Sequence, residues 1–457
     1  MSLTDGAHVT YSRVSEVFAD GSRIDHHYSN HESFPDKACV EMYSNYEGND
    51  VDNPHTSWEL SRGLLTRKEY RSALDGHPIV RLEENEYYLD TLQYLRVVKF
   101  SGHCGNTLRR KSFMKVFTYH PYLKRTVITA YPDNEAVSHV ETVEYTCDSC
   151  RRLIETKRMV GDVTERDSYS YTGDFNMAPY VGMKGRNMIA LPVESLHFRK
   201  ESDSDERLIA AELRTWKQSG SHFVPSEIYR AALGEGIPFS INGVPGFSLY
   251  NGQEKDSRYG LIPDLSYSQY DEWGNLILSE DHSGLPTTYY WIAEQLRLSA
   301  VFVGSKKGTD TPGSSDAGNF FMDFESVYNA PVGFMKGKGH YGVYLIEGFA
   351  PEAGKQYVVD WMERQDDGTW EYRSKVLLAT DVFSAGTSGK YIDQIRVFPK
   401  DTFVESFTWD QFGNLSSRTD SRGVTEYYRY DGLGRLTGIY DNDGKKVEGY
   451  KYNYQNR

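Results

Sequence analysis

The chain has few cysteines and no long apolar runs. Four cysteines in 457 residues are too few for disulfide bonds to carry the fold. Cys147 and Cys150 are the closest pair in the sequence, and metal binding, a local disulfide and free thiols are all open for them. No apolar run approaches the ~20 residues of a membrane-spanning helix, and the first residues lack the apolar core of a signal peptide.

Basic surface and catalytic motifs are also missing. The formal charge of −14, and the lack of interleaved aromatic residues in the compact basic cluster at 109–111, predict no nucleic-acid partner. The sequence contains no serine nucleophile elbow, zincin helix, phosphate-binding loop or recognisable pair of catalytic carboxylates. We therefore expect a protein that is not an enzyme and needs no cofactor.

Aromatic side chains are abundant instead. Tyrosine occurs 35 times, and aromatic residues make up 14% of the chain. Rings favour strands, where pairs on neighbouring strands stabilise a sheet. The composition therefore predicts an all-β protein with few short helices, and the length allows two or more domains.

A short pattern occurs three times, in which an aromatic residue precedes Asp-x-x-Gly and is followed by Asn or Arg and then Leu. The copies are Tyr270-Asp271 with Gly274, Trp409-Asp410 with Gly413, and Tyr430-Asp431 with Gly434. Aspartate can accept hydrogen bonds from the backbone of a turn, and glycine tolerates positive φ. The pattern therefore predicts a turn between two antiparallel strands, with structural roles for these residues.

The copies also share a period. Trp409 and Tyr430 are 21 positions apart, and 21 positions after Tyr270 lies Trp291. Each interval holds a second turn, at 281–284 and at 420–423. Two short strands with their turns fit such a unit, so an array of hairpins stops at Trp291 and resumes by Trp409.

These residues resemble the YD-repeat (RHS) family, and most of all large Bacteroidetes-type surface or secreted proteins of that family. The resemblance implies that successive hairpins form a long antiparallel sheet. In some members such a sheet forms a shell around a toxin domain. The stretch from Tyr430 to Tyr454 carries the most specific part of the resemblance.

The interruption between the repeats has the length and the turn-separated short strands of one β-sandwich. We expect strands at 318–324, 341–346, 356–362, 369–373 and 391–398, with a hairpin turn at 366–368. Several of these segments resemble galactose-binding-like jelly rolls, which occur as carbohydrate-binding modules. In the strand from Tyr357, Trp361 shares a face with Val359, which favours a place in the core over ligand binding.

Two kinds of site follow for this sandwich. Trp370 and Tyr372 offer rings that could stack on a sugar. The resemblance also implies a structural calcium, with Asp323, Glu325 and Asp393 as its carboxylates. The alternative for Asp393 is a bond to a neighbouring turn.

Four regions are expected along the chain. Residues 1–115 form a β-rich region that begins with a hairpin, and residues 116–291 form a sheet of YD-like hairpins. Residues 292–402 are the inserted sandwich, and residues 403–457 complete the sheet. Within the second region, Tyr119, Tyr145 and Tyr171 recur every 26 residues and mark looser hairpins.

One short helix is predicted, from about Ser226 to a stop at Gly234. As to function, we expect a non-enzymatic part of a bacterial surface or secreted protein, active in scaffolding, adhesion or recognition. The alternatives are a carbohydrate-binding module and a piece of a toxin-encapsulating shell. The expected partner is a glycan or another surface protein.

Overall fold

The computed structural model forms two compact units. The described residues are 11–38, 42–43, 55–101, 110–132, 139–202, 204–238, 246–292, 296–306, 318–327, 330–347, 349 and 351–452. Unit 1 consists of Met1–Asp174, Ala190–Ala211 and Ala232–Leu249, and unit 2 of Phe175–Ile189, Glu212–Ala231 and Tyr250–Arg457. Nearly all regular structure is antiparallel β, which confirms the predicted all-β class. No helix in the described residues is long and apolar enough to cross a membrane.

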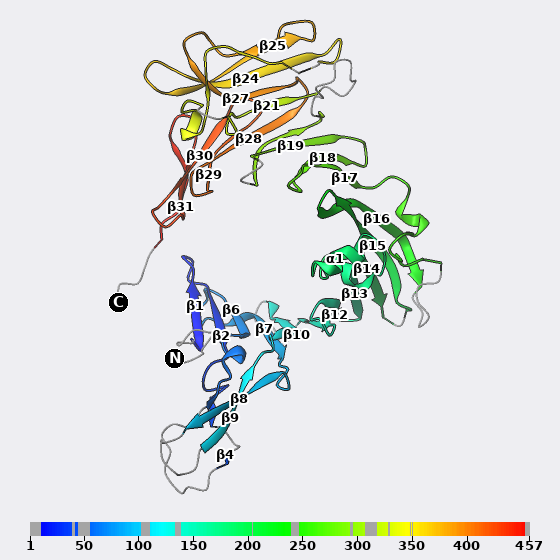
Figure 1. Cartoon of the computed structure of the whole chain (residues 1–457). Helices are drawn as coiled ribbons and strands as arrows, with labels where there is room; N and C mark the ends of the chain where they lie inside the picture. Colours follow the sequence, from blue (N-terminus) through cyan, green and yellow to red (C-terminus); the bar gives the residue numbers. More distant parts are fainter. Residues whose placement is uncertain are drawn as a thin grey trace. The chain divides into compact units, whose positions relative to one another are not determined.

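Unit 1 is built from strands that pair in antiparallel ladders (Figure 1). They are β1 (Arg13–Val17), β2 (Arg23–Tyr28), β6 (Leu65–Arg71), β7 (Ile79–Tyr88), β10 (Tyr122–Ala130), β11 (His139–Cys147), β12 (Leu153–Val160), β13 (Val163–Tyr171) and β14 (Pro192–Glu201). Smaller elements are β3 (Lys37–Ala38), β4 (Met42–Tyr43), β5 (His55–Thr56), β8 (Tyr94–Ser101), β9 (Arg110–Phe117) and the 3₁₀ turns η1 (Glu59–Ser61) and η3 (Thr172–Asp174).

The hairpins predicted for this part of the chain are confirmed. β1 and β2 form the N-terminal hairpin, with Ser15 opposite Asp25. β10 to β13 form successive antiparallel pairs at the places marked by the evenly spaced tyrosines. Cys147 and Cys150 carry free thiols, and Cys39 and Cys104 lie outside the described residues.

Unit 2 contains a sheet that we call the repeat sheet. Its strands are β17 (Leu265–Tyr270), β18 (Leu276–Asp281), β19 (Pro286–Ile292), β20 (Arg297–Val303), β28 (Phe403–Trp409), β29 (Leu415–Thr419), β30 (Thr425–Tyr430), β31 (Leu436–Tyr440) and β32 (Lys446–Gly449). Each strand pairs antiparallel with the next one in this order. Because β20 pairs with β28, the ladder continues directly across the interruption. The strand β20, inside the range 292–402, is thus part of the repeat sheet.

The predicted helix at Ser226 is wrong. These residues lie in the long strand β16 (His222–Pro238), where Glu227 and Ile228 pair with β17. Val224 and Ile228 are buried in this strand. One or two turns of helical pattern are a weak preference, which burial and pairing in a sheet override. β15 (Arg207–Ser219) and β16 contribute residues to both units, and unit 2 also holds α1 (Tyr180–Gly185) and η4 (Ser257–Tyr259).

The residues between β20 and β28 form what we call the inserted domain. A sheet of five strands contains β21 (Phe320–Met322), β22 (His340–Tyr341), β24 (Gln356–Arg364), β25 (Trp370–Leu378) and β27 (Tyr391–Pro399). A second sheet pairs β23 (Tyr344–Leu345) with β26 (Ser384–Ala385), and η6 (Phe334–Lys336) is a 3₁₀ turn. Four of the five predicted strands and the turn at 366–368 are confirmed. The single strand predicted at 341–346 is wrong, because Gly342, with φ of +94°, separates β22, which pairs with β27, from β23, which pairs with β26. The more specific assignment to a jelly roll stays a prediction.

The strand β27 is buried on both faces. Ile395 and Val397 lie in the core of the inserted domain, together with Trp361, whose predicted place in the core is confirmed. Phe398 packs on the other side against Phe302 of the repeat sheet. The inserted domain therefore packs directly on the repeats that flank it, as Figure 1 shows for β27 and β28.

A β-bulge interrupts β27 at Gln394. Asp360 and Met362 of β24 are two residues apart, but their partners Arg396 and Asp393 are three apart. Gln394 has a left-handed backbone, with φ of +52°. Bulges redirect side chains and occur often beside functional sites, and this one lies at the pocket described below.

Candidate functional site

The predicted repeat turns share one geometry. In each, Oδ1 of the aspartate accepts hydrogen bonds from the backbone N–H groups two and four residues later, at 2.8–3.0 Å for Asp271, Asp410 and Asp431. The glycines Gly274, Gly413 and Gly434 have φ between +75° and +88°. The turns at 281–284, 420–423 and 441–444 repeat this pattern, each with an aspartate and a positive-φ glycine.

The aromatic residues of the pattern bond back to the preceding repeat. The side chains of Trp291 and Tyr430 donate to the carbonyl oxygens of Leu276 and Leu415, at 2.7 and 3.0 Å. Trp409 makes the equivalent bond at 2.9 Å to Leu298, which is 111 positions earlier, on the far side of the inserted domain. Tyr270 donates at 2.8 Å to the carbonyl of Pro225, in β16. In the structure, the side chains of all four aromatic residues thus hydrogen-bond to the backbone of a neighbouring strand.

This bond can be tested at Tyr430. We expect Tyr430→Phe to lower the free energy of unfolding by about 1 kcal/mol, because the Leu415 carbonyl loses its donor. Tyr428, on the same strand, is a matched control, since its hydroxyl donates only to the Glu426 side chain beside it. Tyr428→Phe should change stability by less than about 0.5 kcal/mol. Equal losses in urea unfolding of the two variants would contradict the role of Tyr430.

A buried ion pair fastens the inserted domain to a repeat turn. Asp360 and Arg396 are 0% and 1% exposed, and the guanidinium donates to both carboxylate oxygens, at 2.7 and 2.9 Å. Arg396 also donates at 3.1 and 2.9 Å to the carbonyl oxygens of Thr419 and Asp420. Burial raises the pKa of Asp360, against the opposing attraction of Arg396. Burial alone would lower the pKa of Arg396, but the carboxylate of Asp360 raises it.

Tyr372, a predicted ligand residue, belongs to this cluster. Its hydroxyl donates at 2.9 Å to Asp360, and its ring packs on the repeat turn at Gly423, where a β-carbon would lie 2.4 Å from the ring. Burial raises the pKa of Tyr372, and the charge of Asp360 adds to that rise. The structure therefore gives Tyr372 protein partners on both the hydroxyl and the ring.

Trp370, the other predicted ligand residue, lines an open groove. Its ring meets that of Phe334 at 6.0 Å between centroids, and Phe334 meets Tyr427 of the repeat sheet at 6.2 Å. We call the surface around these three rings the aromatic groove, which Arg364, Thr369 and Lys336 also line. The groove combines side chains of the inserted domain with a ring of a repeat.

The predicted calcium ligands hold a glycine-rich loop. Asp393 accepts from the backbone N–H of Phe334 at 2.9 Å, and Glu325 accepts from that of Lys338 at 2.8 Å. β-Carbons at Gly333 and Gly337 would lie 2.6 and 2.2 Å from these carboxylates, so the loop passes directly over them. Asp393 thus bonds a neighbouring turn, as the alternative for this residue expected.

The charges of these carboxylates act on one another. Burial raises the pKa of Asp323 and of Glu325, and it raises that of Asp393 well above its usual value. Repulsion from Asp323 and Glu325 adds to the rise at Asp393. Within the ranges that the structure describes, no three His, Cys, Asp or Glu side chains are arranged to hold a metal ion. Calcium at Asp323, Glu325 and Asp393 stays a prediction.

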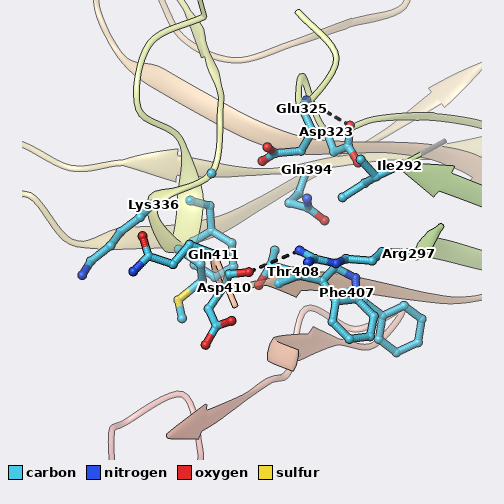
Figure 2. Close-up of a pocket in the computed structure, with 14 residues that line it drawn as sticks. Ile292, Arg297, Asp323, Glu325, Lys336, Gln394, Phe407, Thr408, Asp410 and Gln411 are labelled. Carbon is cyan, nitrogen blue, oxygen red and sulfur yellow. Dashed lines mark hydrogen bonds between the residues drawn. The ribbon is translucent and has the colours of Figure 1, made fainter. Parts of the chain in front are cut away.

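A cavity of about 260 Å³ lies where Asp323 and Glu325 face the repeats, and we call it the junction pocket. The inserted domain lines it with Asp323, Glu325, Gln394 and residues 334–337. The repeat sheet lines it with Ile292, Arg297 and residues 407–411, so Trp409 and Asp410 of the repeat pattern also belong to it. Figure 2 shows the acidic side chains and Gln394 on one side of the view and Arg297 with Asp410 on the other.

Backbone strain gathers around the junction pocket. Phe324, Met335, Lys336 and Gln394 all have φ between +52° and +68°. Such conformations cost non-glycine residues about 1–2 kcal/mol each and cluster at functional sites when the surrounding structure enforces them. The junction pocket is therefore the best candidate site in the described residues.

Sequence reasoning missed Arg396, Gln394 and Arg297. Arg396 and Asp360 lie on different strands, and nothing in the sequence joins them. Gln394 gains its role from a bulge that only the pairing of β24 with β27 reveals. The run from Gly333 to Gly339, with glycine at three of its seven positions, was a usable indication of a tight loop.

Comparison with known proteins identifies one segment. Residues 409–446 match the family model described as RHS Repeat, which confirms the predicted repeats at this place. No curated protein matches the chain.

Solved structures of Tc toxin components give weak matches. The structure titled TcdB2-TccC3-TEV is 8% identical with a TM-score of 0.30, over 94% of this chain and 32% of that one. The structure titled TcdB2-TccC3 is 9% identical with a TM-score of 0.29, over 95% and 29% of the two chains. A Photorhabdus luminescens Tc holotoxin pore is 12% identical with a TM-score of 0.15, over 93% and 20%. The chain thus spans about a third or less of the length of the solved chains it matches.

Proposed function

Because residues 409–446 are an RHS repeat, we propose that the chain is a non-enzymatic scaffold within a secreted or cell-surface protein. The repeat sheet holds the inserted domain in a fixed position as a recognition element. The packing of β27 between its own core and the repeat sheet is the observation that supports this most. A recognition element on a scaffold gains affinity when it is rigid before it binds.

Hydrogen exchange of the whole chain in increasing denaturant tests this scaffold. We expect the amides of β27 to open at the same free energy as those of β20 and β28, because Phe398 packs in one cluster with Phe302 of β20 and Val404 of β28. Opening of β24, β25 and β27 at a lower free energy than β20 and β28 would contradict a rigid attachment.

The second candidate function is carbohydrate recognition in the aromatic groove. Trp370 and Tyr427 offer rings that can stack on the apolar faces of sugars, and the buried ring of Phe334 packs against both. Arg364 and Thr369 offer donors for hydroxyl groups. Because Tyr427 belongs to a repeat, the groove needs the whole of unit 2.

A glycan array with the full chain tests this function. We expect Trp370→Ala to lower binding about tenfold or more, because stacking of an aromatic ring on a nucleic-acid base is worth about 1–3 kcal/mol and a ring on a sugar face makes a similar flat contact. Trp273→Ala is the matched control, since Trp273 is half exposed on a repeat turn outside the groove. Binding that survives Trp370→Ala, or no binding to any glycan, would remove this candidate. Recognition of another surface protein and a place in a toxin-encapsulating shell stay predictions.

A further inference from the structure

Two carboxylates, those of Asp323 and Glu325, line the acidic side of the junction pocket. Among the described residues neither carboxylate forms an ion pair, although the ammonium group of Lys338 donates at 2.6 Å to the backbone carbonyl of Glu325. Asp323 accepts one weak backbone hydrogen bond, at 3.2 Å from Glu325. Buried carboxylates are normally paired, because burial of an unpaired charge is costly. A donor group in the pocket would give the carboxylate of Asp323 such a partner.

Gln394 gives an independent indication of a ligand. It is 6% exposed, lines the pocket, and its Oε1 atom is buried without a hydrogen-bond partner. An unpaired buried acceptor costs about 1–3 kcal/mol. In Figure 2 its amide lies between Asp323 and Glu325 on one side and Arg297 on the other. The left-handed backbone of Gln394 holds the side chain in this place at a further cost.

The other side of the pocket offers a cation. Arg297 donates one side-chain hydrogen bond in the described structure, from Nη1 to the carbonyl of Asp410 at 3.3 Å. Its Nη2 atom lies against Gly413, where a β-carbon would be 2.9 Å away. A guanidinium with N–H groups to spare suits a carboxylate, which it can bind through two parallel hydrogen bonds.

We propose that the junction pocket binds the zwitterion of a free α-amino acid. The ammonium group donates to Asp323, Glu325 and Oε1 of Gln394, and the carboxylate accepts from Arg297. The cavity of about 260 Å³ is smaller than the roughly 300–1,000 Å³ of sites for drug-sized ligands, which suits one amino acid. This proposal does not rest on the scaffold function or on the aromatic groove.

Calorimetric titration of the full chain tests the ligand class. The probes are glycine, L-leucine and L-lysine, each beside its methyl ester, which lacks the carboxylate, and its N-acetyl derivative, which lacks the α-ammonium. We expect saturable binding of at least one free amino acid. The ester and the N-acetyl derivative of that amino acid should each bind about tenfold more weakly or worse, because each loses a charged hydrogen-bonded group.

Variants separate binding from folding. Asp323→Asn and Arg297→Gln should weaken binding of the free amino acid about tenfold or more. Gln394→Met keeps the shape of the side chain and removes the unpaired acceptor, so it should abolish tight binding without lowering the melting temperature. Arg418→Gln, at an exposed ion pair on β29, is the control that should leave binding unchanged.

Three results would overturn the proposal. The first is no binding of any of the three free amino acids. The second is equal binding of an amino acid and its ester. The third is saturable binding of calcium alone that Asp323→Asn abolishes, because the carboxylates would then belong to a metal site. A Gln394→Met variant that loses stability and binding together would give Gln394 a structural role instead.

Discussion

Arg396→Met is expected to destabilise unit 2 by about 3–5 kcal/mol, the usual cost of removing one partner from a buried ion pair. Asp360 would keep a buried charge with only the Tyr372 hydroxyl as a donor from a side chain. The carbonyl oxygens of Thr419 and Asp420 would also lose a donor. Urea unfolding followed by tryptophan fluorescence measures the loss.

The double variant Asp360→Leu with Arg396→Met should recover much of this stability, because buried ion pairs often add little over apolar side chains of similar size. Arg418→Met is the matched control. It breaks an exposed pair with Glu405 and should cost no more than about 1 kcal/mol. If Arg396→Met and Arg418→Met cost the same, the buried pair does not fasten the inserted domain.

Gly423→Ala is expected to destabilise unit 2 by roughly 2–5 kcal/mol. An L-residue at φ of +82° costs about 1–2 kcal/mol. The new methyl group would also lie 2.4 Å from the ring of Tyr372, and overpacking of this kind typically costs about 1–3 kcal/mol.

Gly434→Ala separates the two effects. Gly434 has a similar φ of +75°, but no atom lies within 4 Å of a β-carbon there. We expect only the backbone cost of about 1–2 kcal/mol. Equal losses for the two alanine variants would show that Tyr372 does not rest on the repeat turn. Because Tyr372 also bonds Asp360, Gly423→Ala and Arg396→Met should be non-additive when combined.

The repeats could be predicted because their determinants are local. Asp410 and Gly413 form their turn with residues at most four positions away, so the pattern in the sequence contains the whole interaction. The alternation of apolar residues in the strand around Trp361 likewise predicted that its side chain faces the core. The helix predicted at Ser226 is wrong because these residues pair with β17, which begins more than thirty positions later. A short helical pattern carries no information about such a distant partner.

The site could not be predicted because its contacts join residues that are far apart in the sequence. Asp360 and Arg396 meet across neighbouring strands, and the two are 36 positions apart. The sequence indicates that the ring of Trp370 could stack on a ligand. It does not show that Tyr427, 57 positions later in a repeat, lines the same groove. The junction pocket depends on a bulge and on a loop with two left-handed residues, Met335 and Lys336. Such strain arises from tertiary packing and leaves little trace in the composition.

The bond from Trp409 to Leu298 has a consequence for which domains can be inserted between the repeats. The chain leaves β20 and returns in β28, and paired strands lie about 5 Å apart. A domain whose two ends lie close together can therefore occupy this hairpin without breaking the register of the sheet, provided that it also covers Phe302 and Val404, which Phe398 covers here, and chain termini in domains are often close. The connection between β20 and β28 is thus a position where a different domain could replace the inserted domain while the repeats on both sides stay paired.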